Sequence, residues 1–351
     1  MKDKIKVLMI GPARDVKGGM TSVIDNYFEY GLNSKVELKY IETINDKCKL
    51  LKFFKERKGF IDFKKYINKY DIVHIHMASR RSAFRKGKYL RIAKKNDKKV
   101  ILHIHGAEFK IFLEECNIKQ KKYIEETLNL ADKIIVLSEG WKKYFETIVS
   151  KDKIEVIYNS IVIPDEFDKD INSSKLLFLG RFGHRKGIYD LIDVIERLHN
   201  EDFSVKLYAG GDGEIQKVKS IVKEKNLENN IEILGWIKGK NKENYLRKCS
   251  IYILPSYNEG LPMSLIEGMA YKNIPISTNV GGIPELISNN QNGILITPGN
   301  KEELYLSIKR LLEDSKLRKK LSDNARKTTE EKFNIKNNIE KLLSVYYQLQ
   351  R

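Results

Sequence analysis

The chain has 351 residues, which is more than a single hydrophobic core usually serves, and this length predicts two domains. Its 41% hydrophobic and 32% charged residues indicate a folded globular protein, and no apolar run approaches the ~18 residues that a membrane-spanning helix needs. The net charge of +18 favours anionic partners over cationic ones.

The first residues and the cysteines together indicate a cytoplasmic protein. Segment 1–15 has only a short apolar stretch and no small-residue cleavage site, so we do not expect a signal peptide. Cys48, Cys116 and Cys249 are odd in number and far apart, which gives neither a disulfide framework nor a metal-ligand spacing. We therefore expect the reducing environment of the cytoplasm.

The first half of the chain alternates short apolar runs with longer amphipathic stretches. The runs predict strands buried on both faces, at residues 5–10, 72–76, 100–105, 134–137 and 155–158. The stretches between them predict helices, among them residues 21–30, 86–95 and 119–130. This β-α-β order predicts a doubly wound α/β domain over residues 1–165.

A second series of the same kind follows a polar, acidic stretch at residues 161–174, which we interpret as a linker. Its predicted strands are residues 176–179, 205–209, 231–234, 251–254, 274–277 and 294–296. Its predicted helices include residues 188–199, 263–271 and 301–312. We expect a second doubly wound domain over residues 166–330 and a C-terminal helix, 331–351, that packs back toward the first domain.

Two cations stand in the loop that should follow the first strand of the second domain. In LLFLGRFGHRKG, residues 176–187, the strand ends at Gly180, Arg181 and Lys186 follow, and a helix opens after Gly187. Cations beside the free amides of a helix N-terminus suit a diphosphate. The alternative is an ordinary basic surface loop.

Two carboxylates stand in PSYNEGLPMSLIEGMA, residues 255–270. Glu259 and Glu267 are eight positions apart, a little over two helical turns, so they would align if the helix began near Gly260. Paired carboxylates suit sugar and ribose hydroxyls, and Gly260-Leu261-Pro262 would give close backbone approach and a helix start. The alternative is one helix-capping carboxylate and one exposed helix residue.

Two further loops carry glycine pairs that precede helices. Gly281-Gly282 in NVGGIPELI is a phosphate-friendly loop and also a normal helix start. Gly18-Gly19 follows the first strand but completes no G-x-G-x-x-G, so the dinucleotide signal is weak.

Four histidines fall on two predicted strands of the first domain. His74 and His76 end one strand, and His103 and His105 end the next. Because each pair alternates along its strand, we expect only one histidine of each pair to meet a shared ligand, and no HExxH or cysteine spacing supports a metal. His105, at the strand tip beside Gly106, is the histidine that we expect in the ligand cleft.

These motifs occur in an order that resembles the family-4 retaining glycosyltransferases of the GT-B fold, over nearly the whole chain. The most specific segment is NEGLPMSLIEGMA with Glu259 and Glu267. The others are GGM (18–20), HIHG (103–106), GRFGHRKG (180–187), GGDGE (210–214) and VGGIPE (280–285). The resemblance implies two Rossmann-like domains that face a central cleft.

The resemblance also implies roles for the matching residues. Arg181 and Lys186 would hold the donor diphosphate, and Glu267 would bind the ribose hydroxyls. Glu259 would face the transferred sugar, beside the backbone of Gly260, Leu261 and Pro262. His105 would lie by the donor sugar and Gly19 by the phosphates.

The resemblance implies a retaining hexosyl transfer without a metal or other cofactor, from a nucleotide-sugar donor, a UDP-sugar more than a GDP-sugar. The acceptor would be a saccharide or lipid-linked saccharide of bacterial surface polysaccharide synthesis. Asp168 and Asp170 form the one D-x-D of the chain, and it falls in the linker.

The positive charge is concentrated in the first domain. Residues 1–165 hold 35 basic and 22 acidic side chains, and residues 80–99 hold ten basic side chains and one acid, Asp97. Segment 50–70 interleaves Phe53, Phe54, Phe60 and Phe63 with lysines. One hypothesis is peripheral attachment to the inner face of the plasma membrane, with Arg85, Lys86 and Arg91 in the contact. The alternative is that the phenylalanines are core residues and the charges a solvated helix face.

Three other functions compete with sugar transfer to an acceptor. One is that of an inactive partner subunit, and the presence together of Arg181, Lys186, Glu259 and Glu267 speaks against it. A nucleotide-sugar epimerase of the same fold would act on the donor alone. A basic nucleic-acid-binding protein is supported by the charge but by no binding motif, so we expect no nucleic-acid partner.

Overall fold

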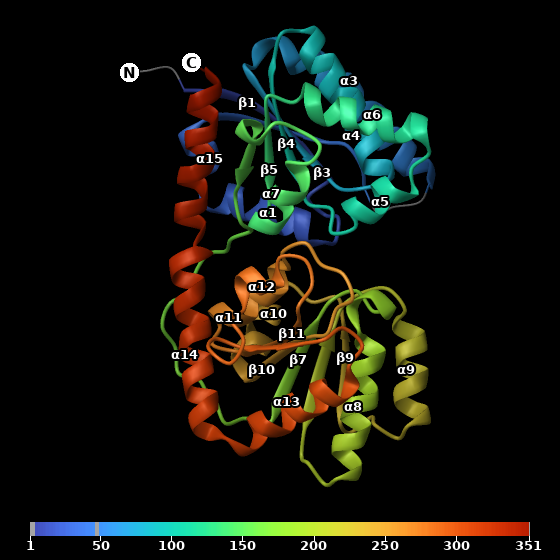
Figure 1. Cartoon of the computed structure of the whole chain (residues 1–351), viewed down its shortest axis with the longest axis vertical. Helices are drawn as coiled ribbons and strands as arrows, with labels where there is room; N and C mark the ends of the chain where they lie inside the picture. The colour runs from blue at the N-terminus through green and yellow to red at the C-terminus, as the bar shows by residue number, and fades with distance from the viewer. Residues whose placement is uncertain (1–3, 46–48, 351) are drawn as a thin grey trace. The chain divides into compact units, whose positions relative to one another are not determined.

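The computed structural model describes residues 4–45 and 49–350, so Cys48 lies outside it. The chain divides into two units, which we treat separately: unit 1 comprises Met1–Val162 and Asn334–Arg351, and unit 2 comprises Ile163–Phe333 (Figure 1). Within the described residues, no helix combines the length and the apolar character required to span a bilayer.

Unit 1 is built on a parallel sheet whose described strands run in the order β2-β1-β3-β4-β5-β6. The strands are β1 (Lys6–Gly11), β2 (Glu37–Glu42), β3 (Ile72–Met77), β4 (Lys99–Ile104), β5 (Lys133–Val136) and β6 (Ile154–Val156). All six residues of β3 are buried, and because neighbouring residues of a strand point to opposite faces, helices must cover both faces of the sheet.

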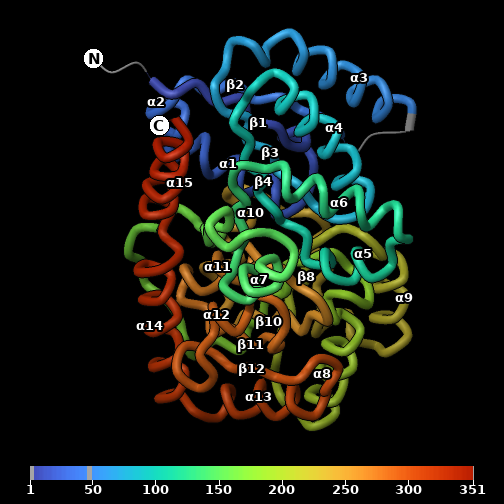
Figure 2. The backbone as a smooth tube through the Cα atoms, turned by 45° about the horizontal axis from the view of Figure 1, so that its top comes forward, coloured from blue at the N-terminus to red at the C-terminus, as the bar shows by residue number. Residues whose placement is uncertain are grey.

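The helices of unit 1 follow the strands as a doubly wound fold requires. They are α1 (Gly19–Glu29), α2 (Leu32–Lys35), α3 (Lys49–Tyr66), α4 (Arg81–Lys95), α5 (Phe109–Glu115), α6 (Ile118–Leu130), α7 (Glu139–Phe145) and α15 (Ile335–Gln350), with 3₁₀ turns η1 (Ile67–Lys69) and η2 (Lys151–Lys153). Helix α3 lies beside the edge strand β2 (Figure 2). Helix α15, from the end of the chain, contacts β3 and α1.

Unit 2 repeats the plan with the strand order β12-β11-β10-β7-β8-β9. Its described strands are β7 (Lys175–Leu179), β8 (Lys206–Gly210), β9 (Ile231–Gly235), β10 (Ile251–Leu254), β11 (Ile274–Thr278) and β12 (Ile294–Ile296). Its helices are α8 (Ile188–Asn200), α9 (Ile215–Glu224), α10 (Gly239–Lys248), α11 (Met263–Ala270), α12 (Ile283–Leu286), α13 (Lys301–Glu313) and α14 (Ser315–Lys332), with the 3₁₀ turn η3 (His184–Lys186). The doubly wound α/β fold is therefore confirmed.

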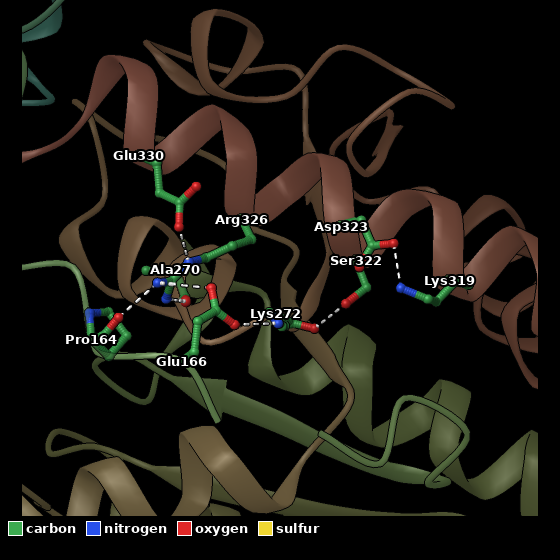
Figure 3. Close-up of polar contacts among 9 residues, drawn as sticks. All are labelled: Pro164, Glu166, Ala270, Lys272, Lys319, Ser322, Asp323, Arg326 and Glu330. Atoms are coloured by element: carbon green, nitrogen blue, oxygen red, sulfur yellow. Dashed lines mark hydrogen bonds and ion pairs between the residues drawn. The ribbon is translucent and has the colours of Figure 1, made fainter. Parts of the chain in front are cut away.

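Helix α14 fastens the linker to the body of unit 2 through a buried arginine (Figure 3). The guanidinium of Arg326 donates to the carbonyls of Ala270, at the end of α11, and of Pro164, in the linker, both at 2.6 Å. Lys272, just beyond α11, forms an ion pair of 2.9 Å with Glu166 of the linker. These contacts fix where the chain enters unit 2.

Candidate functional site

The strand order of unit 2 reverses direction between β7 and β10, and ligands of doubly wound sheets bind at the carboxyl ends of the strands flanking such a point. Lys186, in η3 after β7, and Glu259, in the loop after β10, meet there. The Lys186 ammonium forms an ion pair with Oε1 of Glu259. Only 14% of the Lys186 side chain and 6% of the Glu259 side chain are exposed, so this pair is largely withdrawn from solvent.

Other polar groups hold the Glu259 carboxylate in place. The Ser256 hydroxyl donates to Oε1 at 2.8 Å, and Nη1 of Arg185 lies 4.0 Å from Oε2. The same Arg185 nitrogen donates to the carbonyl of Asn258 at 3.0 Å. Ser256 and Arg185 did not stand out in the sequence, because a serine and a third basic residue in a basic loop carry no distinctive pattern.

The loops after β7, β10 and β11 touch through their backbones, which requires glycine at two positions. Gly187 has φ of +69°, and a Cβ there would lie 2.1 Å from the carbonyl oxygen of Pro255. Gly281 has φ of +57°, and a Cβ there would lie 1.9 Å from the carbonyl oxygen of Glu259. The N–H of Gly282 donates to the carbonyl of Gly260 at 2.7 Å. Glu259 is thus supported from both neighbouring loops.

Arg181 and Glu267 have partners of their own in unit 2. Arg181 directly follows Gly180 after β7, is 68% exposed, and places Nη1 3.6 Å from Asp212, in the loop after β8. Glu267 lies on α11 and forms an ion pair of 2.7 Å with Lys242 of α10. Lys242 has no distinctive pattern around it in the sequence.

The expected alignment of Glu259 with Glu267 rested on a helix that begins near Gly260, and that expectation is wrong. Helix α11 begins at Met263, because Pro262 is the extended residue that precedes the first turn. Gly260, Leu261 and Pro262 are buried in the segment that connects β10 to α11. The two carboxylates therefore sit on different elements and are held by different lysines.

In unit 1 the strand order reverses between β1 and β3, and Gly19 and the histidines lie around this point. Gly19 is the exposed first residue of α1, where backbone N–H groups have no carbonyl partner within the helix. His76 is on β3, and His105 follows the last residue of β4.

The four histidine rings form a block of two hydrogen-bonded pairs. Nε2 of His74 lies 3.3 Å from Nδ1 of His103, and Nδ1 of His76 lies 2.9 Å from Nε2 of His105. One pair stacks on the other: the ring centroids are 4.6 Å apart for His74 and His76 and 4.3 Å apart for His103 and His105. The Tyr346 hydroxyl, on α15, lies 2.6 Å from Nδ1 of His74.

Burial keeps these rings neutral. It lowers the pKa of His74 and of His105 to about 3, and holds the pKa of His76 and of His103 well below the usual value. His105 is half-buried, whereas the other three are buried.

The expectation that only one histidine of each pair can meet a shared ligand is wrong in its geometry, because residues i and i+2 of a strand share a face. A nitrogen of His74, His76 and His103 lies within 4.8 Å of the others. The rings are close to parallel, with planes that differ by 16° to 28°, and Nε2 of His74 and Nδ1 of His103 are engaged with each other in a hydrogen bond of 3.3 Å. A metal ion at these nitrogens would have to displace that hydrogen bond.

The basic segment 80–99 is exposed only in part: Arg80, Arg81, Lys88, Lys95 and Lys99 are exposed, whereas other cations of the segment pack against unit 1. Lys86 is buried on α4 and donates to Oγ1 of Thr43 at 2.8 Å, and burial holds its pKa well below the ordinary value. The Arg91 guanidinium lies 3.8 Å over the Tyr123 ring, and Lys94 forms an ion pair of 2.8 Å with Asp132. The predicted contact through Arg85, Lys86 and Arg91 is therefore wrong for Lys86.

The phenylalanines of segment 50–70 divide into two groups. Phe63 is buried, and Phe60 and Phe63 both pack edge-to-face on Tyr89. Phe53 and Phe54, in the first turns of α3, are 53% and 57% exposed. Leu50 and Leu51 are exposed beside them.

Comparison with known proteins identifies the family to which the sequence is similar. Residues 46–163 match the family described as Glycosyltransferase Family 4, and residues 159–328 match Glycosyl transferases group 1. An uncharacterized glycosyltransferase of Methanocaldococcus jannaschii is 32% identical over 71% of this chain and 68% of its own length. A Campylobacter jejuni N-acetylgalactosaminyltransferase, named for a diphospho-undecaprenol-linked acceptor, is 26% identical over 65% of this chain and 67% of its own.

Solved structures share the fold at lower identity. Sucrose-phosphate synthase from Thermosynechococcus elongatus superposes with a TM-score of 0.83 at 18% identity, over 99% of both chains. Anabaena HepE in complex with UDP-glucose superposes with a TM-score of 0.78 at 19% identity, over 98% of this chain and 100% of that one.

Proposed function

Since the chain belongs to the family-4 glycosyltransferases and has their GT-B fold, we propose that it transfers a sugar with retention from a UDP-sugar to a saccharide or lipid-linked saccharide acceptor. The ion pair of Lys186 and Glu259 is the observation that most supports the donor site in unit 2. The UDP complexes of HepE support the choice of base, and the C. jejuni relative supports the class of acceptor. Surface polysaccharide synthesis is the corresponding proposed role.

In this proposal Arg181 and Lys186 bind the diphosphate, and Glu267 binds the ribose hydroxyls. Glu259 faces the transferred sugar, with the backbone of Gly260, Leu261 and Pro262 beside it. His105 and Gly19 serve the sugar and the phosphates from unit 1. Glu259 also fixes the Lys186 ammonium before the donor arrives, so the cation needs little reorganisation when phosphate charge develops.

The proposed reaction exchanges one bond at the anomeric carbon of the sugar. The bond from this carbon to the diphosphate oxygen breaks, and the acceptor oxygen bonds to the same face. The acceptor hydroxyl proton passes to the departing phosphate. Arg181 and Lys186 stabilise the charge on that phosphate, which is the task that a divalent cation performs in other enzymes, and we therefore propose that no metal is required.

Thermal stabilisation by UDP and by GDP in EDTA tests the donor site. A ligand at 100 times its Kd stabilises the folded protein by about 2.7 kcal/mol, a shift of several degrees. We expect this shift with UDP, and about a tenfold or greater loss of affinity in Lys186→Ala. Lys225→Ala is the matched control, since Lys225 of unit 2 is also ion-paired, with Glu196 at 2.5 Å, but at the carboxyl end of α9. No shift with either nucleotide would contradict the proposal.

Product analysis by NMR tests the reaction. We expect an α-linked product from an α-linked UDP-sugar, unchanged by EDTA. Inversion at the anomeric carbon would contradict retention. Reversible conversion of the donor alone into its epimer would identify an epimerase instead.

We further propose that the first turns of α3 attach unit 1 to an anionic membrane surface, as a lipid-linked acceptor would require. Leu50, Leu51, Phe53 and Phe54 are exposed there, and the exposed cations Arg57 and Lys58 follow on the same helix. Exposed aromatic and aliphatic side chains among cations are typical of helices that lie in the headgroup region.

Co-sedimentation with phosphatidylglycerol vesicles tests this attachment. We expect Phe53→Ser/Phe54→Ser to lose most of the binding, and high salt to weaken the binding of the unaltered protein. Leu306→Ser, which removes a 52% exposed leucine from unit 2, is the control and should bind normally. Equal binding of the double variant would contradict the assignment to α3.

A further inference from the structure

The hydrogen bond that joins His76 to His105 constrains which nitrogen of His105 carries a proton. Nδ1 of His76 and Nε2 of His105 are 2.9 Å apart, and the two ring planes differ by 27°. Both rings are neutral, because burial lowers the pKa of each far below neutrality. A neutral imidazole has one N–H and one bare nitrogen, so one of these rings donates and the other accepts.

The second ring nitrogen of His76, Nε2, decides which ring donates in this hydrogen bond. Its Nε2 is buried and has no hydrogen-bond partner among the residues that the structure describes. If Nδ1 of His76 accepted, the proton of that ring would lie on Nε2, as a buried N–H without an acceptor. Unpaired buried N–H groups are rarer than unpaired buried acceptors, so the opposite direction is favoured. His76 then donates from Nδ1, and Nε2 of His105 accepts.

The other histidine pair does not compete for His105. Nε2 of His74 bonds to Nδ1 of His103, and Nδ1 of His74 faces the Tyr346 hydroxyl. Stacking against His103, with centroids 4.3 Å apart, restricts the His105 ring to its plane without hydrogen bonding to it. His76 therefore determines which nitrogen of His105 carries the proton, and His103 helps to determine the plane of the His105 ring.

We infer that His76 is a positioning residue: it holds His105 as the Nδ1–H tautomer, so that His105 donates a hydrogen bond to a substrate oxygen and does not act as a base. This inference rests on the proposed function for the identity of the substrate, a nucleotide-sugar whose hydroxyl or phosphate oxygen accepts the bond. It fits the proposed mechanism, in which the departing phosphate takes the acceptor proton and His105 has no proton to remove.

Nitrogen-15 NMR of histidine rings measures the tautomer directly in the full-length protein. The chain has six histidines, and single substitutions assign their signals. We expect His105 to be protonated at Nδ1 in the unaltered protein, and in His76→Leu to populate the Nε2–H form. His76→Asn should retain Nδ1–H, because the asparagine amide N–H takes the place of the His76 Nδ1–H. His74→Leu, which removes an imidazole from the same strand but from the other pair, should leave His105 unchanged.

Kinetics give the second readout. We expect His76→Leu to lower kcat about 10- to 100-fold with KM changed less than about twofold, and His76→Asn to recover most of the loss. Protonation of His105 at Nε2 in the unaltered protein, or an unchanged tautomer in His76→Leu, would overturn the inference. If NMR shows the expected tautomers but the protein transfers sugar from no nucleotide-sugar, the proposed function is wrong. The assignment of His76 then still stands.

Discussion

Four neutral imidazoles of unit 1, three of them buried and His105 half-buried, make the stability of this unit depend on pH. Burial lowers the pKa of His74 and of His105 to about 3, whereas an unfolded histidine titrates near 6.5. Between these values the unfolded chain binds more protons than the folded one. The stability contribution is therefore complete above pH 6.5 and is lost as the pH falls toward 3.

We expect the free energy of unfolding of unit 1 to fall between pH 6.5 and 5 with a slope that approaches four protons, about 1.4 kcal/mol per pH unit for each ring. The measurement uses urea unfolding in a Trp236→Phe background, where Trp141 of unit 1 is the remaining tryptophan. His74→Phe should reduce the slope by about one proton. An unchanged slope in His74→Phe would contradict the prediction.

Gly281 supports Glu259 in a way that a single methyl group can test. Gly281→Ala introduces a Cβ 1.9 Å from the Glu259 carbonyl oxygen, at φ of +57°. Gly239→Ala is a control of equal backbone strain, because Gly239 has φ of +54° and open space around its Cβ position. We expect both variants to lose about 1–2 kcal/mol of stability from the left-handed conformation. Only Gly281→Ala should lose about 1–3 kcal/mol more and weaken UDP binding, as denaturant titration and calorimetry would measure. Equal losses of stability in the two variants would mean that the loop carrying Glu259 moves away from the new methyl group without cost.

At the level of single elements, the sequence predicted most strands but not β2. The apolar runs that mark buried parallel strands identified the other five strands of the unit 1 sheet and all six described in unit 2. Strand β2, ELKYIE, mixes three charged residues with three apolar ones, because it is an edge strand and is partly exposed. A search for continuous apolar runs passes over such a strand.

Site residues could be predicted only where a charged residue stands just after a predicted strand. Lys186 and Glu259 were selectable because a cation and a carboxylate each stood at the end of a predicted strand. The burial of Lys86 could not be predicted, because it depends on a contact with Thr43. Only the folded unit brings Thr43 close to the Lys86 ammonium group. The contact among the four histidines was not predicted, because the two histidines of each strand were assigned to opposite faces. Residues i and i+2 of a strand in fact share one face.

Helix α14 is the element through which unit 2 holds its own linker, and Arg326 is its principal contact (Figure 3). Arg326→Ala leaves the carbonyls of Ala270 and Pro164 without their charged donor. We expect it to lower the free energy of unfolding of unit 2 by about 2–4 kcal/mol, monitored through Trp236 in a Trp141→Phe background. The neighbouring Lys327 is 72% exposed and 3.9 Å from Glu331, so Lys327→Ala should cost less than about 0.5 kcal/mol. Comparable losses would show that the linker is held elsewhere.

At the scale of the whole molecule, the last helix belongs to the unit in which the chain began. Five large apolar side chains of α15 are buried: Ile335, Ile339, Leu342, Val345 and Tyr346. At about 1.5–3 kcal/mol each, their burial is comparable to the total stability of a typical domain. Unit 1 therefore depends on residues more than 170 positions beyond its first segment, whereas unit 2 is a single continuous stretch.

Truncation after Phe333 should consequently unfold unit 1 and spare unit 2. We expect Trp141 to show the fluorescence of a solvent-exposed indole, and the cooperative unfolding of unit 2 to remain visible through Trp236. UDP should still stabilise that transition, because Arg181, Lys186, Glu259 and Glu267 all lie in unit 2. Truncation after Tyr347 removes only the last turn of α15 and should leave both transitions in place. Loss of both transitions in the shorter chain would mean that unit 2 does not fold without unit 1, and its nucleotide site would then depend on the whole chain.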